Sequence, residues 1–501
     1  MNYNKTPITQ FFLYALFVLL AAPAFANGVW DGGGDGTSWD DPLNWGDDLE
    51  PVATDDVVIP AATTIQVRMA GEVAESITFT DATSILAVIS GDLTVDQGTI
   101  GDLIDMPLGG TINISSGAML RLQNGDNGID ANNGATVNNG GQLIFENLDS
   151  EALDISGAPL LLTNQAGGTI QGIAPFDIDF IDIAGSAAGT VITNSGTIRV
   201  DMNDVGSDFL DVNGQTAIRN EVGGLIDLED IDDNVFELGA SGTTFDNFGT
   251  IDVFESGDEC FELNDGTRFT NHSSGILRTS EVEDEVFEIE DAMVLNEGTI
   301  EVNNIVGTGS VQGTDEVVDI LNSNGRFTNN GTITITGVED QGIIEVDLGV
   351  FTNNNVINMG MGFPSAVITD EAIDLDDGGD ARFVNTKCAI VNITSTNPIE
   401  IGALGQLTND GILTTVFTGI NEIDGIFLNN GLVASPNGIF NSSPNGLTGS
   451  GKLEGAPIPA TVSLCNMEPI PTMSQWGLFI FALLVLNMSI FFLRRSASIL
   501  A

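Results

Sequence analysis

The chain has 501 residues, of which 71 are acidic and only 13 are basic, so its formal net charge at pH 7 is −58. A polyanion of this size repels nucleic acid and anionic lipid head groups, which excludes a nucleic-acid-binding protein. Disorder, coiled coil and collagen are excluded as well, because apolar residues are plentiful and regularly spaced and neither heptads nor a Gly-X-Y period occurs.

Residues 1–26 have the pattern of a secretory signal peptide. Lys5 supplies a positive start, an apolar stretch runs from Phe11 to Ala22, and Ala24-Phe25-Ala26 forms an A-x-A cleavage site. The apolar run is too short to favour a permanent membrane anchor. We therefore expect the protein to be exported and this segment to be removed.

The next segment, residues 27–60, is rich in tryptophan and glycine. It contains Trp30, Trp39 and Trp45 and the run Asp31 to Gly36, which reads D-G-G-G-D-G. The segment resembles the opening part of bacterial β-helix surface proteins and autotransporter-like adhesins. We interpret it as a cap over the first turn of a β-structure, since an open sheet edge invites aggregation. An aromatic platform for carbohydrate is the less favoured alternative.

Residues 61–455 contain one repeat many times over. A word of the form apolar-x-Asn-x-Gly-Thr-Ile occurs at 192–198, 245–251, 294–300 and 327–333, and looser copies give a mean period of about 26 residues. Short runs rich in Val, Ile, Phe and Thr alternate with polar residues and end at Gly, Asn or Asp, as in strands. Short strands repeating at this period predict an all-β fold, a parallel β-helix of the pectin-lyase-like kind with about 16 rungs.

The repeated asparagine has a structural interpretation. If successive rungs stack in register, the amides of Asn194, Asn247, Asn296 and Asn329 lie above one another and can hydrogen-bond as a ladder. The glycine two residues after each asparagine is expected to supply a turn with positive φ. The Phe or Leu two residues before it is expected to point into the core.

A second repeated word, apolar-acidic-apolar, precedes each asparagine. The acidic residues of this word include Asp211, Glu237, Glu262, Glu288, Asp319 and Glu345. The flanking apolar residues predict that these carboxylates point outward, and stacked rungs place neighbours about 5 Å apart. Many rungs carry a second polar or acidic residue three positions earlier. These second residues include Asp208, Asn234, Glu259, Glu285, Glu316 and Glu371.

This column of carboxylates has two interpretations. Neighbouring charges at that spacing repel by roughly 1 kcal/mol in water, and a solvated acidic face that keeps the protein soluble is the favoured explanation. The alternative is that Ca²⁺ or another divalent cation bridges adjacent carboxylates, since hard cations prefer oxygen ligands.

An enzyme has to be considered because parallel β-helices include polysaccharide lyases and glycosidases. A lyase of this fold needs a Lys or Arg base, and a glycosidase needs two or three carboxylates in one cleft. The repeat region has only Lys387 and Lys452 as lysines, spreads its carboxylates over nearly all rungs, and places its lone His272 beside a repeat asparagine. We therefore predict no catalytic residues and no cofactor.

The chain has three cysteines, Cys260, Cys388 and Cys465. Export permits a disulfide. We expect Cys388 to pair with Cys465 at the end of the solenoid, because Cys260 occupies an apolar position of its repeat. The odd count leaves one thiol free, and the sequence alone does not say which.

The C-terminal part combines a proline-containing linker, residues 456–469, with a distinct terminal element, residues 470–501. In that element an apolar run, residues 477–493, is just long enough to cross a bilayer as a helix, and Arg494 and Arg495 favour a cytoplasmic end. The segment before the run reads Ile470-Pro471-Thr472-Met473-Ser474-Gln475-Trp476-Gly477.

Motif, apolar helix and arginine pair together resemble the IPTL-CTERM sorting signal of Gram-negative bacterial surface proteins. Met473 replaces the usual Leu, and Gln475 stands where Glu is common. The resemblance implies contact with the export machinery, passage through the inner membrane, processing by a membrane sorting peptidase and transfer to the cell surface.

These observations predict an exported, surface-anchored acidic β-helix with a non-catalytic role in adhesion, matrix or envelope structure. Its expected partners are the sorting machinery and an extracellular glycan or other surface ligand. The alternative is a β-helix polysaccharide lyase or glycoside hydrolase that acts on extracellular carbohydrate.

Overall fold

A computed structural model describes residues 28–454 of the chain, with internal gaps at 99–100, 177, 203–207, 304–315, 337–342, 361–367, 377–378, 416–419, 435–438, 443–446 and 451. The predicted signal peptide, the linker, the sorting motif with its membrane helix, and Cys465 all lie outside the described residues. Within them, one short 3₁₀ helix, η1 (Pro42–Asn44), is the only helical element. No helix of this part is both long and apolar enough to span a bilayer.

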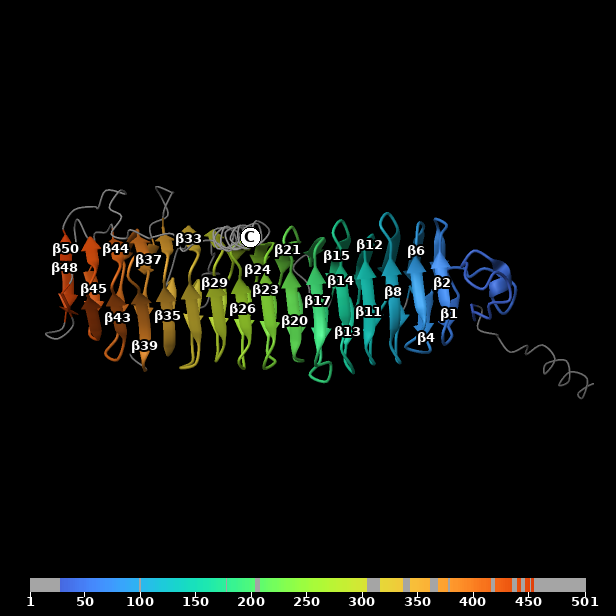
Figure 1. Cartoon of the computed structure of the whole chain (residues 1–501), viewed down its shortest axis with the longest axis horizontal. Coiled ribbons are helices and arrows are strands. Elements are labelled where there is room, and N and C mark those ends of the chain that lie inside the picture. The colour runs from blue at the N-terminus through green and yellow to red at the C-terminus, as the bar shows by residue number, and fades with distance from the viewer. Residues whose placement is uncertain are drawn as a thin grey trace, which may run out of the picture. The chain divides into compact units, whose positions relative to one another are not determined.

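The described chain winds into a parallel β-solenoid of short stacked strands, so the all-β and parallel β-helix predictions are confirmed (Figure 1). Each complete rung contributes one strand to each of three parallel sheets, and each sheet has sixteen strands. Every strand therefore pairs with strands about one repeat away in sequence rather than with its chain neighbours. A small fourth sheet pairs β37 (Ile368–Glu371) with β41 (Ser395–Asn397).

Sheet 1 carries the acidic word of the repeat. Its strands are β1 (Asp56–Ile59), β4 (Ser76–Phe79), β7 (Ile104–Asp105), β10 (Ile129–Asp130), β13 (Leu153–Ile155), β16 (Ile181–Ile183), β19 (Leu210–Val212), β22 (Phe236–Leu238), β25 (Phe261–Leu263), β28 (Phe287–Ile289), β31 (Val318–Ile320), β34 (Ile344–Val346), β38 (Asp374–Leu375), β42 (Glu400–Ile401), β45 (Ile420–Ile423) and β48 (Ile439–Ser442).

Sheet 2 carries the repeated asparagine. Its strands are β2 (Thr64–Val67), β5 (Ile85–Val88), β8 (Gly110–Ile114), β11 (Ala135–Asn139), β14 (Leu161–Asn164), β17 (Thr190–Asn194), β20 (Thr216–Asn220), β23 (Thr244–Asn247), β26 (Arg268–Asn271), β29 (Met293–Asn296), β32 (Arg326–Asn329), β35 (Gly349–Asn353), β39 (Ala381–Asn385), β43 (Gln406–Asn409), β46 (Ile426–Asn429) and β49 (Leu447–Thr448).

Sheet 3 follows the glycine of the repeat. Its strands are β3 (Glu72–Ala74), β6 (Asp92–Asp96), β9 (Met119–Gln123), β12 (Gln142–Leu148), β15 (Thr169–Phe176), β18 (Thr197–Asp201), β21 (Leu225–Ile231), β24 (Thr250–Ser256), β27 (Ile276–Val282), β30 (Thr299–Asn303), β33 (Thr332–Thr336), β36 (Val356–Met359), β40 (Ile390–Ile393), β44 (Ile412–Thr415), β47 (Leu432–Ala434) and β50 (Lys452–Glu454).

Aromatic rings stack along the solenoid core. Side chains alternate between the two faces of a strand, so the apolar positions of all three sheets converge on one interior. Phe236, Phe261 and Phe287 follow one another in sheet 1 with ring centroids 4.6 and 5.1 Å apart, and Phe245 and Phe269 meet them from sheet 2. All five rings are completely buried. Phe245 and Phe269 lie two positions before Asn247 and Asn271, so the prediction that this aromatic residue points inward is confirmed.

The buried asparagines form an unbroken hydrogen-bonded ladder through twelve rungs. In each of eleven steps the Nδ2 of one asparagine donates to the Oδ1 of the asparagine one rung later, at 2.8–2.9 Å. The members are Asn139, Asn164, Asn194, Asn220, Asn247, Asn271, Asn296, Asn329, Asn353, Asn385, Asn409 and Asn429. The same Nδ2 donates to a backbone carbonyl of sheet 3, as from Asn194 to Leu225, so these buried amides are satisfied.

The repeated glycine has a different role from the one that the sequence predicts. Gly196, Gly249, Gly298 and Gly331 do not have positive φ, so the expectation of a left-handed turn is wrong. A Cβ on Gly331 would lie 2.0 Å from the carbonyl oxygen of Gly298, and one on Gly196 would lie 2.2 Å from that of Gly168. Glycine is required there because consecutive rungs approach too closely to admit any side chain.

The tryptophan-rich segment packs against the first rung. Trp30 and Trp39 each contact Trp45 edge-to-face with ring centroids 5.0 Å apart, and all three rings are buried. Parallel bridges from Val29 to Val58 and from Ser38 to Gln66 extend the first strands of sheets 1 and 2. The buried rings contradict an aromatic platform for carbohydrate. The first strand, β1, begins a few residues before the cap boundary at residue 60 that the sequence suggests.

Candidate functional site

The acidic residues of sheet 1 form one continuous column. Register pairs connect twelve carboxylates on consecutive rungs, so all six predicted members lie next to one another in order. The members are Asp105, Asp130, Asp154, Asp182, Asp211, Glu237, Glu262, Glu288, Asp319, Glu345, Asp374 and Glu400. We call this set the acidic column.

A second row of polar side chains runs beside the acidic column, three residues earlier on most rungs. Several of its members are deeply buried: Asp208 is 4% exposed, Glu285 is 3% exposed and Glu316 is fully buried. One member of the row is an asparagine, Asn234, which donates from Nδ2 to Glu262 of the column at 2.8 Å. The acidic face therefore combines a half-exposed column with a neighbouring row that contains buried carboxylates.

Burial and mutual repulsion raise the pKa values of these carboxylates. Burial, followed by the charge of Asp179, raises the pKa of Asp208 to about 9. Burial, followed by Glu237, raises the pKa of Asp211 to about 7, and burial with Glu345 raises that of Asp319 to about 8. The cause in each case is that a carboxylate is partly withdrawn from water beside others of the same charge.

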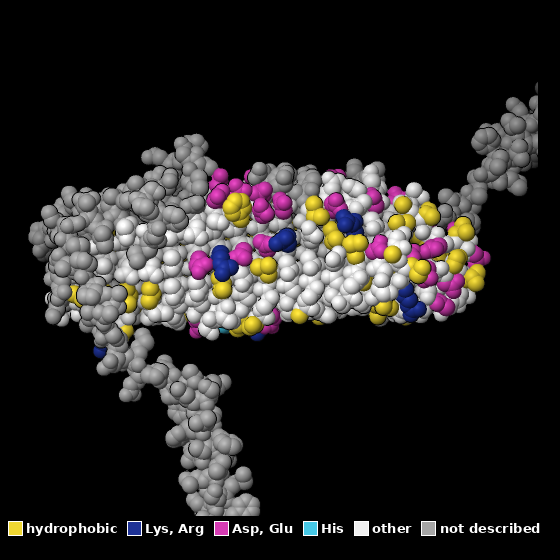
Figure 2. Space-filling view, turned by 90° about the horizontal axis from the view of Figure 1, so that it is seen from above, with side chains coloured by type: hydrophobic (Ala, Val, Ile, Leu, Met, Phe, Trp, Pro, Cys, Tyr) yellow, Lys and Arg dark blue, Asp and Glu magenta, His cyan; other side chains and the backbone are white. Residues whose placement is uncertain are grey.

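Basic side chains lie elsewhere on the solenoid. The described strands of sheet 1 contain no Lys or Arg. On sheet 3, Arg199 pairs with Asp227, and Arg278 bridges Asp252 and Glu301 of the neighbouring rungs at 3.2 and 2.9 Å. Figure 2 shows Asp and Glu side chains spread along one face, with isolated Lys and Arg side chains among them. The sheet that has the densest acidic column thus has no basic residue in its own strands.

The acidic side chains come closest together on the rungs of β25, β28 and β31. There the carboxylates form three overlapping groups, in each of which one oxygen per residue lies within 4.8 Å of the others. The groups are Asp258 with Glu259 and Asp284, Glu259 with Glu285 and Glu288, and Asp284 with Glu285 and Glu316. Only Glu288 among these six belongs to the predicted column. The sequence places Glu259, Glu285 and Glu316 in the second row but gives no sign of their burial, and it does not single out Asp258 and Asp284.

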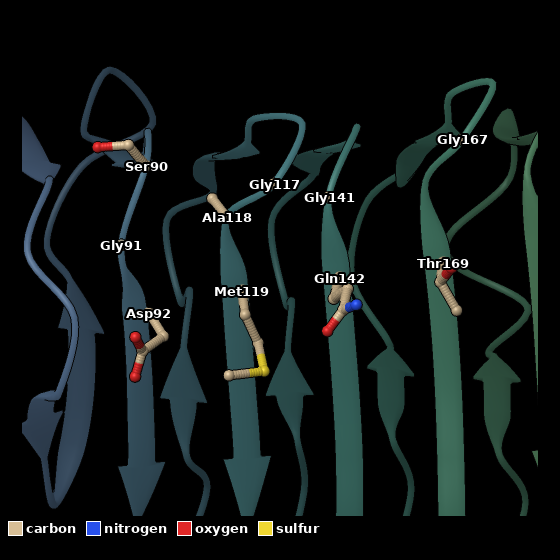
Figure 3. A pocket seen from close by; sticks show the side chains of 10 residues that line it. All are labelled: Ser90, Gly91, Asp92, Gly117, Ala118, Met119, Gly141, Gln142, Gly167 and Thr169. Atoms are coloured by element: carbon tan, nitrogen blue, oxygen red, sulfur yellow. The ribbon is translucent and has the colours of Figure 1, made fainter.

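Two pockets of the described part are open to solvent and poor in ionisable groups. One of about 310 Å³ lies across the turns that lead into β6, β9, β12 and β15, and its lining includes Ser90, Met119, Gln142 and a single carboxylate, Asp92 (Figure 3). Another of about 300 Å³, beside β8 and β11, is lined by Gly, Ala, Thr, Pro, Leu and Val residues. Neither offers the paired carboxylates that a glycosidase needs.

The lone histidine lies on the surface of sheet 2. His272 stacks on Phe248 with ring centroids 3.8 Å apart, and its Nε2 lies 2.7 Å from Oδ1 of Asp246. The guanidinium of Arg219 also lies over the Phe248 ring, 4.3 Å from its centre. These contacts give His272 a structural role between neighbouring rungs.

The cysteines differ in environment. Cys260 is free and completely buried, and burial raises the pKa of its thiol far above the usual range. Cys388 is disulfide-bonded, and the pairing with Cys465 stays a prediction because Cys465 lies outside the described residues.

We expect an aromatic disulfide reagent to label no thiol in the native protein, since neither reagent nor solvent reaches Cys260. After denaturation without reductant, one thiol per chain should react; three reacting thiols would contradict the Cys388–Cys465 pair.

A scan of protein-family models finds none that matches this chain, and a search of curated proteins finds no matching sequence.

Proposed function

We propose that this chain is an exported, surface-anchored protein whose acidic β-solenoid has an adhesive, matrix or envelope-structural role and no catalytic one. The observation that carries the proposal is the continuity of the acidic column, which repeats over twelve rungs. An active site concentrates a few groups at one place, whereas a repeated surface is suited to an extended contact.

The proposed anchoring rests on the terminal segments of the sequence. Residues 1–26 supply the export signal and residues 470–501 supply the element that resembles a sorting signal. Sorting would leave the solenoid on the cell surface, where its partner is an extracellular glycan or another surface ligand. The high negative charge keeps such a protein soluble and directs it toward cationic or cation-bridged partners.

Surface display can be tested in a Gram-negative host that carries a matching sorting peptidase. We expect protease added to intact cells to digest the full chain, because sorting exposes it outside the envelope. A chain that lacks residues 470–501 should be found in the periplasm or the medium. Retention of the full chain in the cytoplasm, or identical distribution of the two chains, would contradict the proposal.

The alternative, a β-helix lyase or glycosidase, is tested by the same purified chain. Release of reducing ends or of unsaturated uronides from acidic polysaccharides would favour the enzyme and overturn the non-catalytic role. We expect no release above the level of a heat-denatured control, because neither of the two pockets described above has paired carboxylates or a basic residue.

A further inference from the structure

The second row of the acidic face contains a carboxylate whose environment is unusual. Glu316 is completely buried, and neither of its oxygens accepts a hydrogen bond from an N–H or hydroxyl group. The side chains that it meets are the carboxyl groups of Glu285 and Glu345. An ionised carboxylate that is removed from water without such donors is strongly destabilising, so it is neutralised either by a proton or by a bound cation. The lack of a protein donor points to a ligand that binds carboxylate oxygens.

The groups that surround Glu316 are themselves acidic. Glu285 occupies the equivalent position one rung earlier, three residues before Glu288 as Glu316 is three residues before Asp319, and Glu288 and Asp319 are register partners. Glu285 is 3% exposed, and Asp284 lies beside it. One oxygen from each of Asp284, Glu285 and Glu316 lies within 4.8 Å of the other two.

This spacing matches the size of a coordinated calcium ion. Ca²⁺ binds carboxylate oxygens at about 2.3–2.6 Å, so two oxygens on opposite sides of one ion lie roughly 5 Å apart. Mg²⁺ binds at about 2.0–2.1 Å, demands near-ideal octahedral geometry and gives up its water reluctantly. A buried, irregular set of carboxylates therefore favours calcium.

We propose that Asp284, Glu285 and Glu316 bind one Ca²⁺ between the rungs of β28 and β31. The ion would neutralise the charge of the buried Glu316. It would also join two consecutive rungs, because each rung supplies at least one of its ligands. Glu259 and Glu288, which lie within 4.8 Å of Glu285 by one oxygen each, extend the negative potential toward the ion. This proposal places one ion at one position, whereas a cation ladder would place ions along the whole acidic column. It does not depend on the proposed adhesive role.

Calcium binding can be measured on the purified full chain by isothermal titration calorimetry at physiological salt and in excess Mg²⁺. Both conditions suppress the diffuse binding that a polyanion shows. We expect one Ca²⁺ per chain with a Kd below about 1 mM, the range of extracellular calcium modules. Tb³⁺ that replaces Ca²⁺ at this site should keep fewer bound water molecules than Tb³⁺ free in solution. Its luminescence lifetimes in H₂O and D₂O measure that number.

Three variants separate this site from the general charge of the chain. Glu316→Gln and Glu285→Gln each remove one ligand charge at constant size, and each should weaken calcium binding about tenfold or more. Glu229→Gln removes the same charge from an exposed position on sheet 3 and should leave the Kd unchanged. Circular dichroism verifies that each variant is folded.

Two results would overturn the proposal. One is a wild-type chain that shows no stoichiometric Ca²⁺ binding in the presence of Mg²⁺. The other is a folded Glu316→Gln or Glu285→Gln variant whose stoichiometry and Kd equal those of the wild type and of Glu229→Gln.

Discussion

Replacing Asn329 by alanine should lower the free energy of unfolding by about 3–5 kcal/mol. The Oδ1 of Asn329 accepts hydrogen bonds from Asn296 and from the backbone N–H of Gly331, and its Nδ2 donates to Asn353 and to the carbonyl of Val356. Truncation leaves these partners unsatisfied in the interior, where no water replaces the lost amide. Chemical denaturation followed by far-ultraviolet circular dichroism measures the change.

The adjacent residue provides a matched control. Asn330 is exposed and accepts one hydrogen bond from Asn354, a surface residue of the next rung. Asn330→Ala makes the same substitution one position away, and we expect it to change the free energy of unfolding by no more than about 0.5 kcal/mol. Equal effects of the two substitutions would show that the ladder contributes no more than surface hydrogen bonds do.

Without divalent cations, the protein should lose stability as pH rises, with a melting temperature about 5–10 °C lower at pH 8.5 than at pH 5. The pKa values of Asp208 and Glu316 are raised to about 9, and that of Glu259 to about 8, by burial and by neighbouring carboxylates. The folded chain therefore binds more protons than the unfolded chain between about pH 4 and pH 9. The contribution of these protonated carboxyl groups to stability is complete below their pKa in the unfolded chain. It is lost as pH rises through their pKa in the folded chain.

The variant that tests this assignment is Asp208→Asn, which lies on the rung of β19, away from the proposed calcium site. Asp208 faces Asp179, Asp233 and Glu237, so an uncharged amide removes repulsion that grows with pH. We expect a higher melting temperature than the wild type at pH 8.5 and a flatter pH profile. Differential scanning calorimetry in EDTA at constant ionic strength measures both. A wild-type melting temperature that is constant or rises over this range would contradict the assignment.

Much of the architecture follows from two spacings in the sequence. The asparagine period alone places one ladder residue on each rung, because a buried amide has to find its partner at the same position of the next rung. The apolar-acidic-apolar word places Asp211 and Glu237 outward and in register, because side chains alternate along a strand. Local patterning was sufficient for these features, since each rung repeats the same contacts.

Features that depend on contact between rungs could not be predicted in the same way. The role of Gly331 depends on the carbonyl of Gly298, a whole repeat away, and the sequence suggests a turn instead. The burial of Glu316 and its distance from Asp284 depend on how consecutive rungs pack against one another. The pairing of β37 with β41 outside the three main sheets has no periodic signal either.

The asparagine ladder also bears on how the length of this protein can change. Each internal member accepts one hydrogen bond from the preceding rung and donates one to the following rung, so the internal members are interchangeable. Excision of one complete repeat, for instance between Asn220 and Asn247, would join two rungs that already present matching groups. Evolution can therefore lengthen or shorten such a molecule by duplicating or deleting whole units, without redesigning a junction.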